Sequence, residues 1–273
     1  MPELTMEESI EVTSVYSVLG MLEKNRLLIK KAPFRSVYPD VTKAGLIGGG
    51  SRPVPGEISL SHKGILFLDE LAEFDRNVMQ SMRAPLENGK ILISRCGEFM
   101  EFPGDFMLVA ASNPCKCGKM LEGGNKCVCT PIQARQYLSR ISKPLLDRID
   151  LHVPVRRVIL DSNIERSETS RDIKKRVLAA REIQRIRFLN ENFKLNGKMH
   201  GKSVYRYCKI SSSCEKLLKN AANDIGSSMR GYEKVLKIAR TIADLAHRKN
   251  IDECDIAEAL QYRFLDSCFQ EAV

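Results

Sequence analysis

The heptapeptide GILFLDE at residues 64–70 decides the fold class of this chain. Its apolar run is continuous, as expected of a strand buried on both faces of a parallel sheet, and it ends abruptly in two carboxylates. Ligands of open α/β proteins bind outside the carboxyl ends of such strands. The sequence therefore predicts an α/β fold with Asp69 and Glu70 at the ligand-binding edge.

A second apolar strand is expected at residues 106–111, and it ends in Ser112-Asn113-Pro114. A helical pattern at residues 74–88 separates the two strands, which favours an α/β sheet, and a hairpin is expected over residues 90–102. Asn113 would then lie near the two acids. Asparagine before proline also commonly starts a turn, so Asn113 indicates a site only in combination with Asp69 and Glu70.

The rest of the chain changes character along its length. Residues 5–19 have helical spacing, whereas residues 33–56 are rich in glycine and proline, which favours an extended loop or insert. Past Val155 only helical patterns remain, at about 168–192, 214–224, 229–249 and 253–264. We therefore expect an α/β core over 1–155, a connecting helix over 156–192 and a helical domain over 193–273.

An acid pair after a buried strand is the Walker B arrangement of nucleotide hydrolases. Asp69 would hold a magnesium ion through its water shell, and Glu70 would polarise the water that attacks the γ-phosphate. Asn113 could orient the same water. The alternative is a strand that simply ends in a solvated turn.

Two arginines could contact phosphate. Arg148 is expected on a short helix just before a strand at 151–153 and could reach a neighbouring subunit, although an internal pair with Asp147 or Asp150 is an equal alternative. Arg230, near the start of a long helix, could extend over the phosphates; otherwise it is a surface arginine.

Four cysteines lie close together in a loop rich in glycine and lysine: Cys115, Cys117, Cys127 and Cys129. Four thiols suffice for a tetrahedral zinc or other soft-metal site. The Cys-x-Cys spacing is tighter than usual, so free thiols or a redox pair remain alternatives, and the lysines also allow a role at a nucleic-acid surface.

Composition narrows the class of protein. The 273 residues, 43% of them hydrophobic, can form a sizeable core, and the apolar runs are too short to span a membrane. The start of the chain lacks the features of a secretory signal, so we expect a cytoplasmic protein with reduced cysteines. The net charge of +9 favours nucleic-acid partners, against the alternative of a solvated basic face.

Several segments have a specific combined pattern: PFRS at 33–36, GLIGGGS at 45–51, PGEISL at 55–60, GILFLDEL at 64–71, NPC at 113–115, LLDRID at 145–150, ARTIADL at 239–245 and QYR at 261–263. Together they closely resemble the magnesium-chelatase-like AAA+ ATPases of the ComM/YifB family. The resemblance covers nearly the whole chain. It implies an AAA+ sheet core followed by an all-helical lid.

The resemblance also implies roles for single residues. Asp69 and Glu70 match the Walker B acids, Asn113 matches sensor 1, Arg148 matches the arginine finger and Arg230 matches the sensor 2 arginine. Members of the family form hexameric rings that hydrolyse ATP with Mg²⁺, and ComM-type members are linked to DNA branch migration.

One expected motif is missing from the sequence. A phosphate-binding loop reads Gly-x4-Gly-Lys-Ser/Thr, and its nearest imitation, residues 45–52, has Arg52 where the hydroxyl belongs and no lysine before it. Residues 34–39 also read FRSVYP where the family has FRSPHH. We therefore expect an N-terminally truncated or split family member without the Lon-like domain and the P-loop strand, which binds ATP weakly and is impaired alone.

Two other functions fit the sequence less well. The first is a non-enzymatic, zinc-containing nucleic-acid-binding remnant. The second is an accessory subunit in metal chelation.

Overall fold

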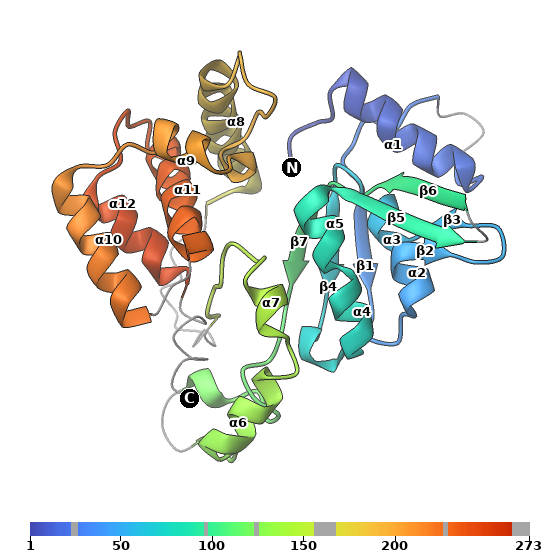
Figure 1. The fold of residues 1–273 in the computed structure, drawn as a ribbon, viewed down its shortest axis with the longest axis horizontal. Helices are drawn as coiled ribbons and strands as arrows, with labels where there is room; N and C mark the ends of the chain where they lie inside the picture. The colour runs from blue at the N-terminus through green and yellow to red at the C-terminus, as the bar shows by residue number, and fades with distance from the viewer. Residues whose placement is uncertain (23–26, 96–97, 123–125, 156–167, 226–228, 264–273) are drawn as a thin grey trace. The chain divides into compact units, whose positions relative to one another are not determined.

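The computed structural model describes residues 1–22, 27–95, 98–122, 126–155, 168–225 and 229–263. The chain divides into two compact units, Met1–Ile149 and Asp150–Val273, which we call unit 1 and unit 2 (Figure 1). Each unit is described by itself. No helix of the described residues is both long and apolar enough to cross a bilayer.

Unit 1 is a mixed α/β structure built on a parallel sheet of three strands in the order β1-β4-β7 (Figure 1). The strands are β1 (Phe34–Val37), β4 (Ile65–Leu68) and β7 (Met107–Ala110). β4 lies in the centre, and Leu66 and Leu68 have no exposed surface. The two apolar strands expected from the sequence are thus confirmed, and they are direct neighbours.

β1 was not expected, because the glycines and prolines of residues 33–56 predicted a loop or insert. That prediction was wrong for the first residues of the segment. Phe34 pairs with Ile65 and Val37 with Leu68, so β1 completes the sheet. The side chain of Arg35, a residue of β1, donates two hydrogen bonds to Glu57, at 2.7 and 2.8 Å.

Shorter elements surround the sheet. The helices of unit 1 are α1 (Met6–Val18), α2 (Lys43–Ile47), α3 (Glu57–Leu60), α4 (Arg76–Ser81), α5 (Arg83–Asn88), α6 (Pro131–Leu138) and α7 (Lys143–Leu146). The antiparallel pairs are β2 (Gly48–Gly49) with β3 (Val54–Pro55), and β5 (Lys90–Arg95) with β6 (Glu98–Pro103). The 3₁₀ turns are η1 (Leu71–Glu73) and η2 (Met120–Glu122). The second pair is the hairpin that the sequence predicts.

The helix predicted over residues 74–88 is interrupted at Met82, between α4 and α5. Pro85 explains the break, because it has no N–H to donate and its ring clashes with the carbonyl four residues earlier. α5 ends at Gly89 in the left-handed conformation, with φ of 67°, which glycine adopts readily at the end of a helix.

The described part of unit 2 consists of helices and their connections. The helices are α8 (Ser170–Arg187), α9 (Lys202–Tyr207), α10 (Ser212–Ile225), α11 (Met229–Leu245) and α12 (Glu253–Gln261), with a 3₁₀ turn, η4 (Asn196–Lys198). Phe188, Leu218, Leu236 and Ile256 are among the side chains of its core. Residues 156–167 of the expected connecting helix lie outside the described residues. The roles of a connecting helix and a lid stay predictions.

Candidate active site and metal site

The ends of β4 and β7 lie at the same edge of the sheet. Leu68 pairs with Ala110 in parallel register, and two hydrogen bonds continue this pairing beyond the strands. Ala111 N donates to Leu68 O at 2.9 Å, and Leu71 N donates to Ala111 O at 2.8 Å. The backbone therefore holds the segment with Asp69 and Glu70 beside the segment that leads to Asn113.

The two acids occupy a tight turn. Glu70 has φ of 54° and ψ of 47°, a left-handed conformation that is uncommon for a residue with a side chain. The Asp69 carboxylate stabilises the turn, because its Oδ1 accepts a hydrogen bond from Glu70 N at 2.9 Å. The buried side chains of Leu71 and Ala72 anchor the next residues. Both carboxylates thus start from a fixed backbone.

Asp69, Glu70 and Asn113 are all exposed. Within the described residues, neither Asp69 nor Glu70 forms an ion pair with a lysine or arginine. Exposed carboxylates that no cation neutralises, with an amide on the next strand, are suitable ligands for a hydrated magnesium ion and a water molecule. The residues present therefore fit magnesium-bound nucleotide at this edge.

Arg148 is held within unit 1. Its Nη2 lies 2.6 Å from Oε1 of Glu87 on α5, and its Nη1 donates to Pro144 O at 2.5 Å. The side chain is only 11% exposed. The internal partner is thus Glu87, whereas the sequence suggested Asp147 or Asp150. Arg230 is an exposed residue of α11 in unit 2, and its role near phosphate stays a prediction.

The four predicted cysteine ligands do come together. Their Sγ atoms all lie within 4.8 Å of one another, and Sγ of Cys115 lies 3.4 Å from that of Cys117 and 3.8 Å from that of Cys127. Four sulfurs at about 2.3 Å from one zinc ion are about 3.8 Å apart. The thiols are free, and these distances exceed the ~2.05 Å of a disulfide.

The backbone around the cluster favours a thiolate. Hydrogen bonds from the backbone of Lys119 and of Val128 lower the pKa of Cys117 to about 6. The pKa of Cys127 is about 11: the backbone of Cys129 lowers it, but burial and the neighbouring thiols outweigh that effect. The cluster therefore gives up a first proton readily, as a cation-binding thiol group must.

The cysteine loop is connected to the sheet edge at both of its ends. Cys115 follows Asn113 by two residues, and α6 begins directly after Thr130, whose side chain and Gln133 form a capping box. Farther along, Arg140 Nη1 lies 2.8 Å from Oε2 of Glu73, three residues after Glu70. Sequence reasoning missed this link, because no local pattern pairs residues 67 positions apart.

Tyr137 of α6 strengthens the link. Its side chain is 7% exposed, and burial together with a hydrogen bond to Glu73 raises its pKa. The guanidinium of Arg140 lies 5.5 Å from the centre of the Tyr137 ring. α6 is therefore attached to the turn that follows the Asp69–Glu70 pair.

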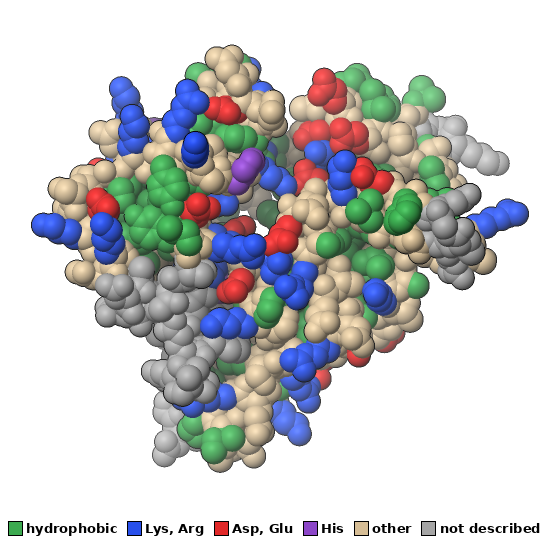
Figure 2. Space-filling model, in the orientation of Figure 1, with side chains coloured by type: hydrophobic (Ala, Val, Ile, Leu, Met, Phe, Trp, Pro, Cys, Tyr) green, Lys and Arg blue, Asp and Glu red, His purple; other side chains and the backbone are tan. Residues whose placement is uncertain are grey.

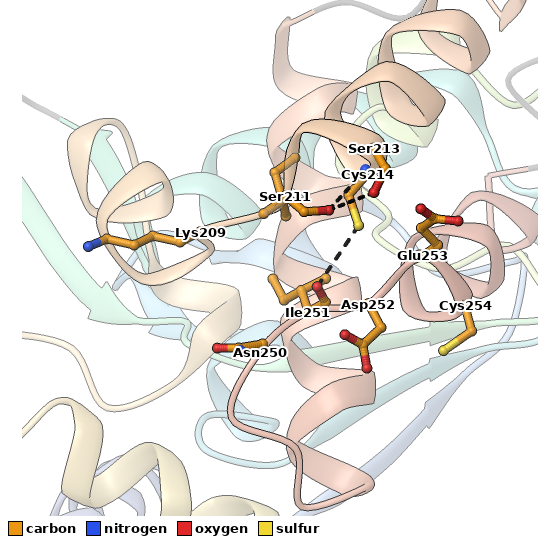
Figure 3. A pocket seen from close by; sticks show the side chains of 10 residues that line it. Lys209, Ser211, Ser213, Cys214, Asn250, Ile251, Asp252, Glu253 and Cys254 are labelled. Atoms are coloured by element: carbon orange, nitrogen blue, oxygen red, sulfur yellow. Dashed lines mark hydrogen bonds between the residues drawn. The ribbon is translucent and has the colours of Figure 1, made fainter.

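A cavity of about 630 Å³ lies in unit 2, between the start of α10 and the start of α12 (Figure 3). Figure 3 shows Cys214 at its wall, where the thiol donates to Ile251 O at 3.9 Å. None of the predicted site residues lines this cavity. The residues that line the cavity belong to unit 2, whereas the sheet edge belongs to unit 1.

Lysine and arginine side chains gather beside α6 on the face shown in Figure 2. The cysteine loop itself contributes Lys116, Lys119 and Lys126, all exposed. Part of the positive charge of the chain thus lies in the loop that carries the cysteine cluster.

Fold and site together define a mixed α/β protein with two exposed acids at one edge of its sheet and a four-cysteine cluster in the loop that follows β7. The model of the magnesium chelatase family, subunit ChlI, matches residues 1–162, and the model of its C-terminal region matches residues 167–263. The chain therefore belongs to the magnesium chelatase ChlI family, which confirms the resemblance.

The competence protein ComM of Haemophilus influenzae is 40% identical over 99% of this chain and 52% of that protein. YifB of Escherichia coli is 38% identical over 97% of the chain and 52% of its own length. The magnesium-chelatase 67 kDa subunit of Chlorobaculum tepidum is 32% identical over 32% of the chain and 16% of its own length. The chain thus spans about half the length of the ComM and YifB relatives.

Proposed function

We propose that the chain is part of an AAA+ ATPase whose water-activating residues lie at the carboxyl edge of the β1-β4-β7 sheet. The register of β4 with β7 carries the proposal, because it brings Asp69, Glu70 and Asn113 to one exposed edge. Family membership supports the same conclusion, and nucleotide with Mg²⁺ is the cofactor that this donor set fits.

Each residue has a chemical role in this proposal. Bound nucleotide and Mg²⁺ supply the phosphoryl group and the charge that neutralises it. Asp69 holds the hydrated cation, Glu70 accepts a hydrogen bond from the attacking water and raises its nucleophilicity, and Asn113 orients that water through its amide. The fixed turn at Glu70 keeps the base in place without reorganisation.

The residues that grip the phosphates are proposed to lie in the part of the relatives that this chain does not span. The sequence has no Gly-x4-Gly-Lys-Ser/Thr loop, and such a loop contributes several charge-assisted hydrogen bonds of about 1.5–3 kcal/mol each. We therefore expect the chain to bind ATP weakly by itself. Arg230 would add a contact to the phosphates from unit 2.

Arg148 is proposed to act as an arginine finger in a homo-oligomeric ring. A guanidinium from a neighbouring subunit stabilises the charge of the transferring phosphoryl group. In this chain Glu87 holds Arg148, so the arginine must exchange Glu87 for a phosphate when the ring forms.

We propose DNA as the macromolecular partner and the cytoplasm as the location. The net charge of +9 and the lysines of the cysteine loop favour a polyanion, because phosphate contacts release counterions. The relative named as a competence protein agrees with this choice. The cysteine cluster is proposed to hold one structural Zn²⁺.

The experiment adds the part of a relative that this chain does not span. The chain is combined with the unmatched part of the Haemophilus influenzae relative, and ATP hydrolysis is measured with and without Mg²⁺. Activity that appears on combination and is lost in Glu70→Gln supports the proposal. A folded complex without hydrolysis would count against it.

The strongest rival is a zinc-containing nucleic-acid-binding protein without enzymatic activity, which the cysteine cluster favours. It predicts salt-sensitive DNA binding that nucleotide does not change, in the combined protein as in the chain. A role in metal chelation has less support, because the similarity to the magnesium-chelatase subunit covers 32% of the chain.

A further inference from the structure

We infer that a zinc ion on Cys115, Cys117, Cys127 and Cys129 fixes the position of Asn113 and ties it to the turn after Glu70. The metal is thus a positioning element for the sheet edge. That it influences nucleotide chemistry rests on the proposed function, whereas the fixing of these segments does not.

The geometry of the cluster suits a metal ion. Four thiols from one loop converge with Sγ separations of 3.4, 3.6 and 3.8 Å among Cys115, Cys117 and Cys127, and Cys129 lies within 4.8 Å of all three. Cys115 is fully buried. Four convergent thiols without a disulfide form a closed tetrahedral site, which selects a soft cation such as Zn²⁺.

A second observation concerns the strand side of the loop. Gly118 N donates to Cys115 O at 3.0 Å, and Gly118 has φ of +76°, a conformation that favours glycine. The turn lies near Asn113, because a Cβ built on Gly118 would be in ordinary van der Waals contact with the Asn113 Oδ1 atom, at 3.6 Å. Whatever holds the cysteine turn in place therefore also sets how much space the amide of Asn113 has on that side.

A third observation concerns the helix side. α6 follows Cys129 after one residue and is attached to η1 through Glu73, which contacts both Arg140 and Tyr137. The chain thus leaves the end of β7, passes through the cluster and returns to the residues just after Glu70. A metal at the cluster closes this path into a rigid loop.

Without a metal, the loop would depend on weak interactions. The Arg140–Glu73 pair is partly exposed, at 53% and 41%, and such pairs contribute little in water. Among the described residues of the loop, 116, 119, 120, 126 and 128 are exposed, so these side chains add little packing. Four metal–thiolate bonds are the only strong constraint that the described residues of this loop offer.

The test measures zinc content and hydrogen exchange in the full 273-residue chain. We expect one zinc per chain by elemental analysis, and less than a tenth of that in Cys117→Ser. Amide exchange should then rise, roughly tenfold or more, in residues 107–114 and 131–140, while residues 57–60 and 229–245 keep their protection. Cys254→Ser, which removes an exposed thiol of unit 2, is the matched control and should change neither quantity.

Two further measurements keep the test decisive if Cys117→Ser does not fold. The wild-type chain is stripped with a zinc chelator and refilled, and exchange in the two segments should rise and then return. Cys129→His, which retains a ligand nitrogen, should keep the metal and near-normal exchange. Neither readout depends on ATP hydrolysis.

The inference is overturned by a chain that contains no zinc or contains iron instead. It is equally overturned if zinc leaves and exchange in residues 107–114 and 131–140 stays the same. A uniform rise across unit 1 would also contradict it, since the metal would then support the whole unit and not this loop.

Discussion

Asp69 in unit 1 and Asp244 in unit 2 are the same residue type used in opposite ways. Asp69 is exposed, and its carboxylate accepts a hydrogen bond from the backbone N–H of the next residue. Asp244 has no exposed surface and accepts hydrogen bonds from Arg187, Arg240 and Asn196. A carboxylate that the fold has already neutralised is structural, whereas one held at a sheet edge without a cation remains available to a ligand.

The largest effect is expected from the structural acid. Asp244→Ala leaves two buried or half-buried guanidinium groups without their carboxylate, because Arg187 Nη2 and Arg240 Nη2 lie 2.5 and 3.1 Å from its Oδ1. We expect a loss of about 3–5 kcal/mol in the free energy of unfolding. Urea unfolding followed by circular dichroism measures it. Asp172→Ala, which removes an exposed pair with Lys175 and a hydrogen bond from Thr169 at the start of α8, is the control and should shift the midpoint far less.

The opposite result is expected at the sheet edge. Asp69→Asn keeps an oxygen for the hydrogen bond from Glu70 N, so the midpoint of urea unfolding should stay at the wild-type value. Mg²⁺-dependent nucleotide binding by the combined protein should weaken at least roughly tenfold, because a cation ligand has lost its charge. A clear loss of stability with unchanged nucleotide binding would reverse the comparison and make Asp69 structural.

Arg148 is the intermediate case, since it is paired internally but proposed to act between subunits. Glu87→Gln removes the charge that holds it, and we expect a modest loss of about 1 kcal/mol in unit 1. If Glu87 only holds Arg148 until the ring forms, the assembled ring of the Glu87→Gln variant should hydrolyse ATP at the wild-type rate or faster. Arg148→Lys should lower the hydrolysis rate. Equal rates for Glu87→Gln and Arg148→Lys would argue against Arg148 as an arginine finger.

The smallest effect is expected from His62, through the dependence of stability on pH. Burial lowers the pKa of His62 below its ordinary 6.5, and the positive charge of Lys63 lowers it further. The hydrogen bond from the ring to Glu11 and the negative charge of Asp105 raise the pKa, but burial has the largest effect. The unfolded chain therefore binds more protons near pH 6, and stability should fall as the pH drops below about 6.5. His62→Gln should flatten this part of the stability–pH curve, and an unchanged slope would assign it to other groups.

The sequence predicted the features that are local. A continuous apolar run predicted β4. The polar residues after β4 and β7 predicted the candidate site, because the ends of two neighbouring parallel strands lie at the same edge of the sheet. Cysteine spacing likewise predicted that the four thiols come together, whereas the metal itself stays a prediction. β1 was missed because Phe34–Val37 is short and lies among glycines and prolines, so its strand character comes from pairing with β4.

Other features were beyond the sequence because they join distant residues. Glu87 as the partner of Arg148 is 61 positions away (148 − 87), and the Arg140–Glu73 link spans 67. Such pairs depend on how helices pack, which composition and periodicity do not encode. The attachment of the cysteine loop to the sheet edge, on which the zinc inference depends, is of this kind.

The rate of Mg²⁺-dependent ATP hydrolysis in wild-type and Glu70→Gln forms of the combined protein tests the central claim most directly. The account predicts that the variant binds ATP as tightly as the wild type but hydrolyses it roughly 100-fold or more slowly, because only the group that activates water is lost. Equal hydrolysis rates in the two forms would contradict the assignment of the sheet edge as the active site.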